Sequence, residues 1–299
     1  MDMQTQHSDY GKGLFYGIIC YFTWGLFPLY WKMLEHVSSF EILCHRIIWS
    51  CMFMTIFFWG VRKMHIKHYV IGIKQYLLLL FTGLLMTLNW GLYIWAINHH
   101  YIVESSLGYY INPLFSVLFA SLFLKESLNK SQKIAIVFAL IGVLYFTIDY
   151  GRFPIISLVL ATSFAIYGLM KKKMGIDATA ALTVETMWMA PLALGYVVIM
   201  CYSGNSAINT LHIPTILLLL GAGIVTALPL LWFGKSAERI PLSTLGFLQY
   251  VSPTMQLLLG VFLFGEQFAG AHIVCFSCIW VGLIIYSVDI IRSVRRNRK

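Results

Sequence analysis

Ten long runs of apolar residues, separated by short polar connections, dominate the pattern along the chain. Each run approaches the roughly 20 residues that an α-helix needs to cross a bilayer. Transmembrane β-strands would be about 10 residues long with strict alternation, and these runs are too long and too evenly apolar for that. The pattern therefore predicts an all-α integral membrane protein with ten transmembrane helices. The predicted spans are 13–31, 41–60, 76–97, 102–124, 132–149, 153–170, 180–202, 213–234, 241–264 and 270–291.

The composition fits a protein whose surface faces lipid. Hydrophobic residues make up 59% of the 299 residues and charged residues 11%, whereas a soluble domain carries about 25% charged residues. This excludes soluble globular, disordered and coiled-coil proteins. It also excludes a nucleic-acid-binding protein, although the net charge is +9.

The positive charges are distributed unevenly between the two sets of connections. Eighteen of the 21 Lys and Arg residues fall in the two terminal segments and in the connections 61–75, 125–133, 171–179 and 235–240. The alternate connections hold only Lys32 and Arg152. Because positively charged connections remain in the cytoplasm, we expect both termini to be cytoplasmic. The same basic connections are expected to attract anionic lipid.

The second half of the chain repeats the first half at an offset of 140 residues. Each repeat contains five predicted helices, so the second copy enters the membrane upside down. The two predicted repeats are 13–149 and 153–291, and inverted-topology repeats of this kind are typical of secondary transporters. The corresponding residues include Pro113 and Pro253, Glu126 and Glu266, Gly142 and Gly282, Tyr110 and Tyr250, and Asp149 and Asp289.

Two corresponding predicted helices, 102–124 and 241–264, carry matching polar stripes. The spacing i, i+3, i+4 and i+7 puts each stripe on one helical face. A polar face is costly in lipid, so the stripes either line a water-filled cavity or hydrogen-bond helices to one another. Because they recur in both repeats, we interpret them as a cavity lining. The stripes are Tyr109, Asn112, Pro113 and Ser116 in the first helix, and Gln249, Ser252, Pro253 and Gln256 in the second.

Aromatic side chains gather on two further helices. Trp31 lies near a helix end, where aromatic residues usually anchor a helix at the membrane interface. Trp24 and Trp90 lie deeper and are either core residues or cavity residues. Taken together, the aromatic residues predict a cavity suited to flat or cationic ligands. The two groups are Tyr21, Trp24, Pro28 and Trp31 in 13–31, and Asn89, Trp90 and Tyr93 in 76–97.

Arg46 and Glu185 are ionisable residues inside predicted helices, each about 8 Å from a helix end. They hold nearly equivalent positions in the two repeats, on opposite sides of the membrane, which argues against a pair between them. Each is either half of a structural ion pair or a functional contact, with substrate or with a proton. The candidate partners are Glu41, His45 or Glu104 for Arg46, and Lys235 or Arg239 for Glu185.

Other motifs for chemistry are few. The sequence has no Walker, HExxH or Ser/His/Asp pattern, and its six cysteines do not form a disulfide framework. The C-x-x-C of Cys275 and Cys278 lacks a second pair of ligands. We therefore expect no enzyme activity, no cofactor and no metal site. Glu126 and Glu266 follow predicted helices and are expected to favour the positive N-terminus of the next helix.

Five stretches of the sequence resemble the RarD proteins, which are EamA-type members of the bacterial drug/metabolite transporter superfamily. The resemblance covers nearly the whole chain. It implies ten helices, a place in the bacterial cytoplasmic membrane and movement of small organic metabolites, usually as an exporter of amino acids or related compounds. Some relatives import metabolites, so the direction stays open. The stretches are 24–32 (WGLFPLYWK), 41–46 (EILCHR), 89–96 (NWGLYIWA), 106–113 (SLGYYINP) and 245–250 (LGFLQY).

We therefore expect a secondary transporter that exports a small amino-acid-like or aromatic metabolite by alternating access. The alternatives are a metabolite importer or exchanger, and a membrane sensor or drug-sensitivity factor without transport. The expected partners are this small molecule and membrane lipid, and a monomer is compatible with the sequence. Glu185 is the candidate proton-coupling residue. The candidate substrate-binding residues are Tyr21, Trp24, Arg46, Asn89, Trp90, Tyr93, Tyr109, Asn112, Gln249, Tyr250 and Gln256.

Overall fold

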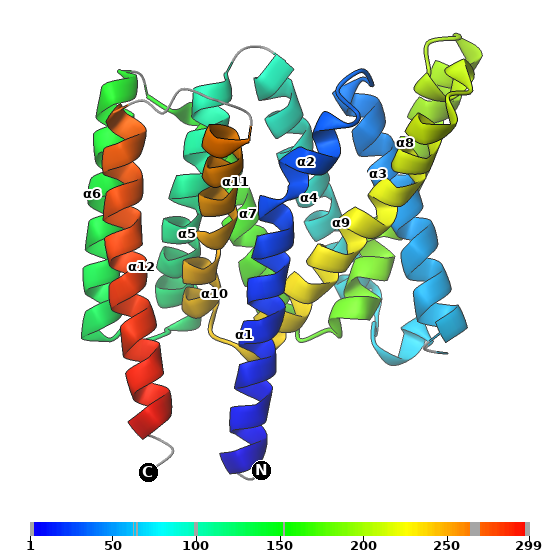
Figure 1. Ribbon diagram of the computed structural model, residues 1–299. Coiled ribbons are helices and arrows are strands. Elements are labelled where there is room, and N and C mark those ends of the chain that lie inside the picture. The colour runs from blue at the N-terminus through cyan, green and yellow to red at the C-terminus, as the bar shows by residue number, and fades with distance from the viewer. Residues whose placement is uncertain are drawn as a thin grey trace.

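The computed structural model describes residues 3–61, 63, 65–98, 101–151, 153–263 and 270–296, and these form helices joined by short connections (Figure 1). In chain order the helices are α1 (Met3–Gly25), α2 (Phe27–Lys32), α3 (Ser39–Thr55), the π-helix η1 (Ile56–Val61), the 3-10 helix η2 (Ile66–His68), α4 (Ile73–Asn98), α5 (Ile102–Leu124), α6 (Lys130–Tyr150), α7 (Ile155–Met174), α8 (Ala178–Tyr202), the 3-10 helix η3 (Ala207–Thr210), α9 (Ile213–Arg239), α10 (Leu242–Leu248), α11 (Val251–Phe262) and α12 (Gly270–Arg296).

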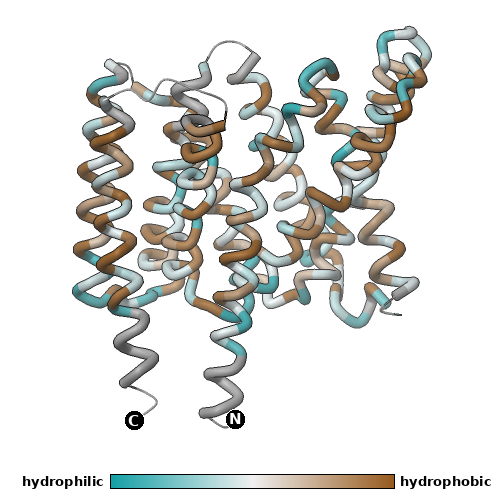
Figure 2. The backbone as a smooth tube through the Cα atoms, in the orientation of Figure 1, coloured by the Kyte–Doolittle hydropathy of each residue, from teal (hydrophilic) through white to brown (hydrophobic). Residues whose placement is uncertain are grey.

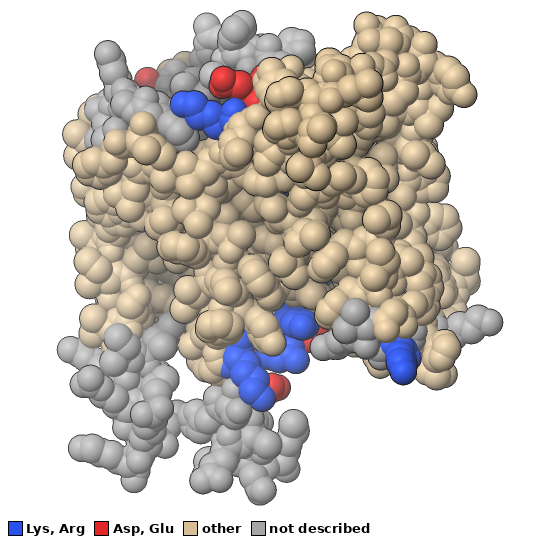
Figure 3. Space-filling model, turned by 45° about the vertical axis from the view of Figure 1, so that its right-hand side comes forward, with Lys and Arg blue, Asp and Glu red and all other residues tan. Residues whose placement is uncertain are grey.

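The long helices lie side by side, and both termini emerge at the same end of the molecule (Figure 1). Hydrophobic residues follow the helices along their length, whereas hydrophilic residues collect toward the two ends (Figure 2). On the face shown in Figure 3, charged side chains lie near the ends, and a broad band without charge separates them. This arrangement suits a bilayer, because charge is costly in the hydrocarbon region and tolerated at its borders.

Eight helices among the described residues are long and apolar enough to cross a membrane, and they correspond to the first eight predicted spans. The predicted span 241–264 consists instead of two short helices, α10 and α11. The predicted span 270–291 falls within α12, whose described apolar part runs over Ile273–Asp289. The chain is therefore an all-helical multi-pass membrane protein across the residues described here.

The first predicted span is interrupted at Leu26, between α1 and α2, because Pro28 has no N–H to continue the helical hydrogen bonds. The carbonyl of Trp24, which such an N–H would have reached, instead accepts a hydrogen bond of 3.3 Å from the side-chain amide Nε2 of Gln256. A side chain of α11 thus satisfies a backbone group that the proline left open, as lipid requires.

The second interruption separates α10 from α11 at Gln249 and Tyr250. Pro253 removes the N–H that would have bonded to the Gln249 carbonyl, and the N–H of Ser252 donates to that carbonyl instead, at 3.1 Å. The chain is thereby tightened just before α11 begins. Both interruptions lie on elements that face the interior, so they can place polar groups away from lipid.

Helix pairs far apart in the sequence form the packed body. α6 packs against α12, α5 against α7, α1 against α9, and α3 against both α8 and α9. α4 packs against α7 and α8. The largest group of buried apolar side chains lies between α1, α7, α8 and α9.

Two glycines mark where α6 and α12 touch. A Cβ atom on Gly142 would stand 2.9 Å from the carbonyl oxygen of Cys275, and one on Gly282 would stand 2.9 Å from the carbonyl oxygen of Ala135. Both distances are too short for a side chain. Since Gly282 follows Gly142 by 140 residues and Cys275 follows Ala135 by the same interval, the two contacts are copies of each other.

Glu126 follows α5 at the end of the molecule that carries the termini. Its carboxylate accepts hydrogen bonds from the N–H of Leu242 (2.8 Å) and from the N–H and hydroxyl of Ser243 (2.9 and 2.6 Å), so it caps α10. The prediction that it serves the next helix was wrong, because Asn129 and Gln132 cap α6 with a capping box. Its predicted counterpart, residue 266, lies outside the described residues.

Candidate functional site

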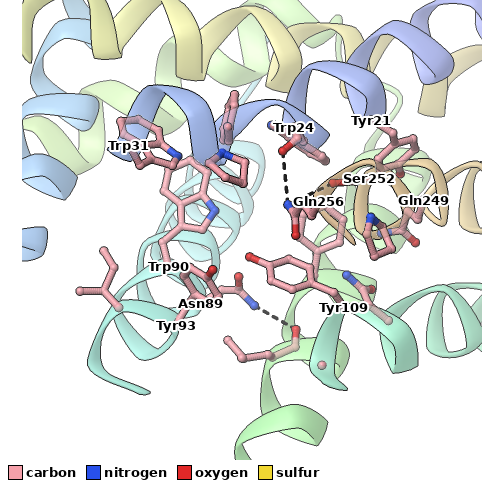
Figure 4. Close-up of a pocket in the computed structure, with 18 of the residues that line it drawn as sticks. Tyr21, Trp24, Trp31, Asn89, Trp90, Tyr93, Tyr109, Gln249, Ser252 and Gln256 are labelled. Atoms are coloured by element: carbon pink, nitrogen blue, oxygen red, sulfur yellow. Dashed lines mark hydrogen bonds between the residues drawn. The ribbon is translucent and has the colours of Figure 1, made fainter. Parts of the chain in front are cut away.

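A cavity of about 320 Å³ lies between the helices, within the size range of small-molecule sites in proteins. Its walls come from α1, α2, α3, α4, α5, α7 and the α10–α11 break. In Figure 4, Trp31, Asn89, Trp90 and Tyr93 stand on one side, and Gln249, Ser252 and Gln256 on the other. The predicted site residues that line it are Tyr21, Trp24, Arg46, Asn89, Trp90, Tyr93, Tyr109, Asn112, Gln249 and Gln256.

The end of the cavity nearer the termini is closed by a group of packed aromatic rings. Phe233 of α9 is central to this floor, with ring centroids 6.4 Å from Tyr21, 5.4 Å from Phe164 and 5.7 Å from Tyr167. Trp24 packs edge-on against Phe164 at 5.7 Å. At the other end, residues of α2 and the first residue of α3 line the cavity. The cavity therefore extends toward the end opposite the termini.

Side-chain amides supply the polar groups of the cavity, and most are held by protein contacts. The Nδ2 of Asn89 donates to the carbonyl of Leu160 (2.9 Å) and to the hydroxyl of Ser163 (2.7 Å). The Oε1 of Gln249 accepts a hydrogen bond of 2.9 Å from the hydroxyl of Ser116. The two polar stripes therefore do both things that the sequence left open, since they join α5 to the α10–α11 break and also line a cavity.

Two buried polar atoms at the cavity have no partner among the described residues. They are the Oδ1 of Asn112 and the hydroxyl of Tyr21. A buried polar atom without a hydrogen bond carries a free-energy cost of about 1–3 kcal/mol. Both residues line the cavity, so a bound molecule or water in it would relieve that cost.

Arg46 of α3 is held in the cavity wall by contacts that the sequence did not predict. Its Nε donates to the hydroxyl of Thr226 at 2.9 Å. Its guanidinium lies over the rings of Trp31 (4.7 Å) and Trp90 (4.3 Å), within the range of a cation–π contact. Trp31 thus belongs to the cavity, and the interpretation of it as a membrane-interface anchor was wrong.

Neither of the described carboxylate and histidine candidates partners Arg46. The carboxylate of Glu41 accepts hydrogen bonds from the hydroxyl of Ser206 (2.5 Å) and the N–H of Ala207 (2.9 Å). The Nδ1 of His45 accepts from the indole of Trp49. α3 directs these side chains toward η3, whereas Arg46 faces the cavity. The side chain of the third candidate, residue 104, lies outside the described part.

Glu185 of α8 forms a buried ion pair with Lys171, whose Nζ lies 2.7 Å from its Oε2. The hydroxyl of Thr82 donates to its Oε1 at 2.5 Å. The predicted partners were wrong, because the last turn of α7 brings Lys171 to Glu185, while Arg239 pairs with Asp9 and Glu238. In the sequence Lys171 looked like part of a solvated connection, but only about 7% of it is exposed.

A second, smaller cavity of about 40 Å³ is lined by both Arg46 and Glu185, together with Thr226 and Tyr167. This volume exceeds the roughly 10–15 Å³ that one water molecule needs. The two charged groups form no ion pair with each other, in line with the sequence argument. They are nevertheless closer in the fold than their assignment to opposite sides of the membrane implied.

Among the predicted substrate-binding residues, Tyr250 alone lies outside the wall of the large cavity. Only 2% of it is exposed, and its hydroxyl donates to the carbonyl of Tyr110 at 3.3 Å. The break before α11 turns its ring into the core between α5 and α12. Tyr250 therefore supports the structure instead of facing the cavity.

Sequence reasoning missed several residues of the site. Thr226 lies in a uniformly apolar run, and Lys171 is one of three consecutive lysines, so neither is distinguished from its neighbours. Phe164 and Phe27 line the cavity but look like lipid-facing residues in the sequence. Within the described part of the chain, no three His, Cys, Asp or Glu side chains gather as a metal site would require.

Comparison with known proteins agrees with this architecture. Residues 11–148 match the EamA-like transporter family. The chain is 42% identical to "Uncharacterized transporter YojE" of Bacillus subtilis, over 98% of this chain and 99% of that protein. It is 40% identical to "Protein RarD" of Escherichia coli, over 96% and 98%.

One solved structure, titled only "Crystal structure of protein", superposes with a TM-score of 0.70 and 16% identity, covering 92% of this chain and 97% of the other. That likeness concerns the fold alone. The sequence relationship is closer and spans nearly the full length of the relatives. The chain therefore belongs to the RarD family of EamA-type transporters, in the drug/metabolite transporter superfamily.

Proposed function

We propose that this transporter moves a small organic metabolite across the bacterial cytoplasmic membrane by alternating access, as a secondary exporter. The observation that carries the proposal is the cavity of about 320 Å³, which gathers ten polar and aromatic candidate residues between the helices. It reaches toward the end opposite the termini and is closed by aromatic rings on the other side. Such a cavity is expected of a carrier that opens to one side at a time.

The inverted repeat supplies the second conformation in this proposal. The matching contacts of Gly142 with Cys275 and of Gly282 with Ala135 support two equivalent five-helix units, 13–149 and 153–291. The packing agrees, since α1 on α9 corresponds to α7 on α4, and α3 on α9 corresponds to α8 on α4. Exchange of the two units' conformations would close the present opening and open the other end.

The proposed orientation places both termini in the cytoplasm, and labelling of single cysteines tests it. Ser206 is a poor probe because it is buried against Glu41, whereas Asn205 beside it is exposed. In a background without the six native cysteines, an impermeant thiol reagent added outside cells should label Asn205→Cys and leave Lys125→Cys unlabelled. The reverse result would invert the proposed orientation.

Glu185 is the proposed proton-coupling residue, with Lys171 as its counter-ion. In the present conformation Lys171 and Thr82 hold the carboxylate, and the aromatic floor shields it from the large cavity. Opening of the end near the termini would admit water and separate the pair, so that Glu185 takes up a proton. The small cavity shared with Arg46 has room for water and brings the substrate site close to this residue.

Flux in proteoliposomes tests the proposal. Asn112→Leu and Gln249→Leu remove polar groups from the cavity, and both should abolish transport while the protein still inserts, because leucine is favoured in the bilayer. Thr147→Leu is the matched control, since the hydroxyl of Thr147 bonds only to the carbonyl of Val143 in its own helix. Full activity of both cavity variants would contradict the proposal. Net uptake of substrate into cells would show that the direction of transport is import and not export.

A further inference from the structure

Arg46 is the only charged side chain among the described residues that line the large cavity. No described carboxylate lies within ion-pair distance of it. The contrast with Lys171 is direct, because that lysine, which is buried, has Glu185 at 2.7 Å. An unpaired charge in the interior of a membrane protein is costly, and such residues mark substrate or ion sites.

The contacts of Arg46 leave one part of the guanidinium available. Its central carbon, Cζ, lies over the rings of Trp31 and Trp90, and its Nε is occupied by Thr226. The edge formed by the two terminal nitrogens has no hydrogen-bond partner among the described residues. That edge is a planar fork of N–H donors, which matches the two oxygens of a carboxylate.

The rest of the cavity contributes acceptors but no negative charge. The amide nitrogens of Asn89 and Gln256 are used by the protein, which leaves their oxygens for a ligand. The Oδ1 of Asn112 has no partner. The rings of Trp24 and Tyr109 line the same cavity and offer an apolar surface.

We infer that the substrate is an organic carboxylate with an apolar or aromatic body. Its carboxylate binds the terminal edge of Arg46, its body packs on the aromatic rings, and an N–H or O–H group donates to the amide oxygens. The inference rests on the proposed function, which makes the bound molecule the cargo. The inference also narrows the range of possible ligands. Trp31 and Trp90 already contact the guanidinium of Arg46, so they offer little attraction for a cationic ligand.

Equilibrium binding to the purified protein in lipid nanodiscs tests the carboxylate directly. The probes are 4-hydroxyphenylpropionate, its primary amide and tyramine, which share the phenol and differ in the charged end. Tryptophan fluorescence, excited at a wavelength that the phenols do not absorb, reports binding, since Trp24, Trp31 and Trp90 of the chain's nine tryptophans line the cavity. Because hydrogen bonds to charged groups are the strong ones, the carboxylate should bind at least about tenfold more tightly than the amide or the amine.

Three variants locate the effect. Arg46→Gln should remove the preference for the carboxylate, and Thr226→Val, which frees the guanidinium, should reduce it. Gln256→Glu adds a negative charge to the same cavity and leaves Arg46 unchanged. It should weaken binding of the carboxylate probe but not binding of the amide. This third variant keeps the test decisive if Arg46→Gln does not fold.

The carboxylate inference is overturned by equal affinity for the three probes, by no measurable affinity for the carboxylate, or by a preference that persists in Arg46→Gln. Its failure can be told apart from failure of the proposed function. Flux of a compound without a carboxylate would overturn the inference and leave transport standing. Tight binding of the carboxylate without flux of any compound would support the inference and overturn the proposed transport.

Discussion

Arg46 and Glu185 are each the eighth residue of their helices, α3 and α8, and those helices pack against each other. The carboxylate of Glu185 is buried and is held by a lysine and a hydroxyl. Arg46 has two indoles and one hydroxyl, and its terminal nitrogens remain unused. Equivalent positions in the two halves of the chain therefore have different roles because their neighbours differ. The partner of an interior charge indicates its role better than the charge itself does.

The largest expected effect separates these two charges by stability. Lys171→Met leaves the carboxylate of Glu185 buried without its cation, which should lower the free energy of unfolding by roughly 3–5 kcal/mol. Arg46→Met leaves no carboxylate without a partner and removes mainly two cation–π contacts. It should therefore lower the free energy of unfolding by less than about 2 kcal/mol. Denaturant titration in detergent micelles measures both.

A neutral double variant serves as the control for that comparison. Lys171→Met combined with Glu185→Leu removes both charges and should recover much of the lost stability, because a buried ion pair gains little over apolar packing. If Arg46→Met were the more damaging single change, the contrast between the two sites would be wrong.

The comparison assumes that the two halves are equivalent, and the paired glycines test this assumption. Gly142→Ala and Gly282→Ala each force a Cβ against a carbonyl at 2.9 Å, so both should cost about 1–3 kcal/mol, and by similar amounts. Gly91→Ala and Gly195→Ala are matched controls, because nothing lies within 4 Å of their added methyl groups. If thermal unfolding showed a large loss of stability for only one of the two paired variants, the two repeats would not be structurally equivalent at this contact.

A smaller effect is expected at another hydrogen-bonded carboxylate, Glu126. It accepts hydrogen bonds from N–H groups at the start of α10 and forms no ion pair within 4 Å among the described residues, so Glu126→Ala should cost about 1–2 kcal/mol. Asn129→Ala, in the exposed cap of α6, should cost about 1 kcal/mol. Hydrogen exchange would show the loss confined to α10 in the first variant and to the start of α6 in the second.

Much of the fold could be predicted because the bilayer dictates helix length and hydrophobicity. Eight predicted spans reappear as long apolar helices, and ten predicted residues share one cavity. The two helix breaks were harder to place, although Pro28 and Pro253 lie close to them. A proline can kink, end or begin a helix, and the outcome depends on which neighbouring group replaces the lost hydrogen bond. Gln256 makes that repair for Trp24, from a helix more than 200 residues away.

Ion-pair partners could not be predicted, for a related reason. The lysines 171–173 are identical in the sequence, and only the helical phase of α7 selects Lys171 to meet Glu185. The same limit applies to Tyr250, where an unforeseen change of direction at the α10–α11 break turned a candidate site residue into the core. Sequence periodicity gives the face of a regular helix, and it fails where the helix is interrupted.

The most direct test of the whole account compares two transport modes in proteoliposomes for variants of the two charges. The account predicts that Arg46→Gln loses both substrate exchange and transport driven by a pH gradient, because the substrate is no longer held. Glu185→Gln, and the charge-balanced Glu185→Gln with Lys171→Gln, should keep exchange and lose only pH-driven transport, measured per folded, inserted molecule. Survival of pH-driven transport in the Glu185 variants, or of full exchange in Arg46→Gln, would contradict the division of labour between the two sites.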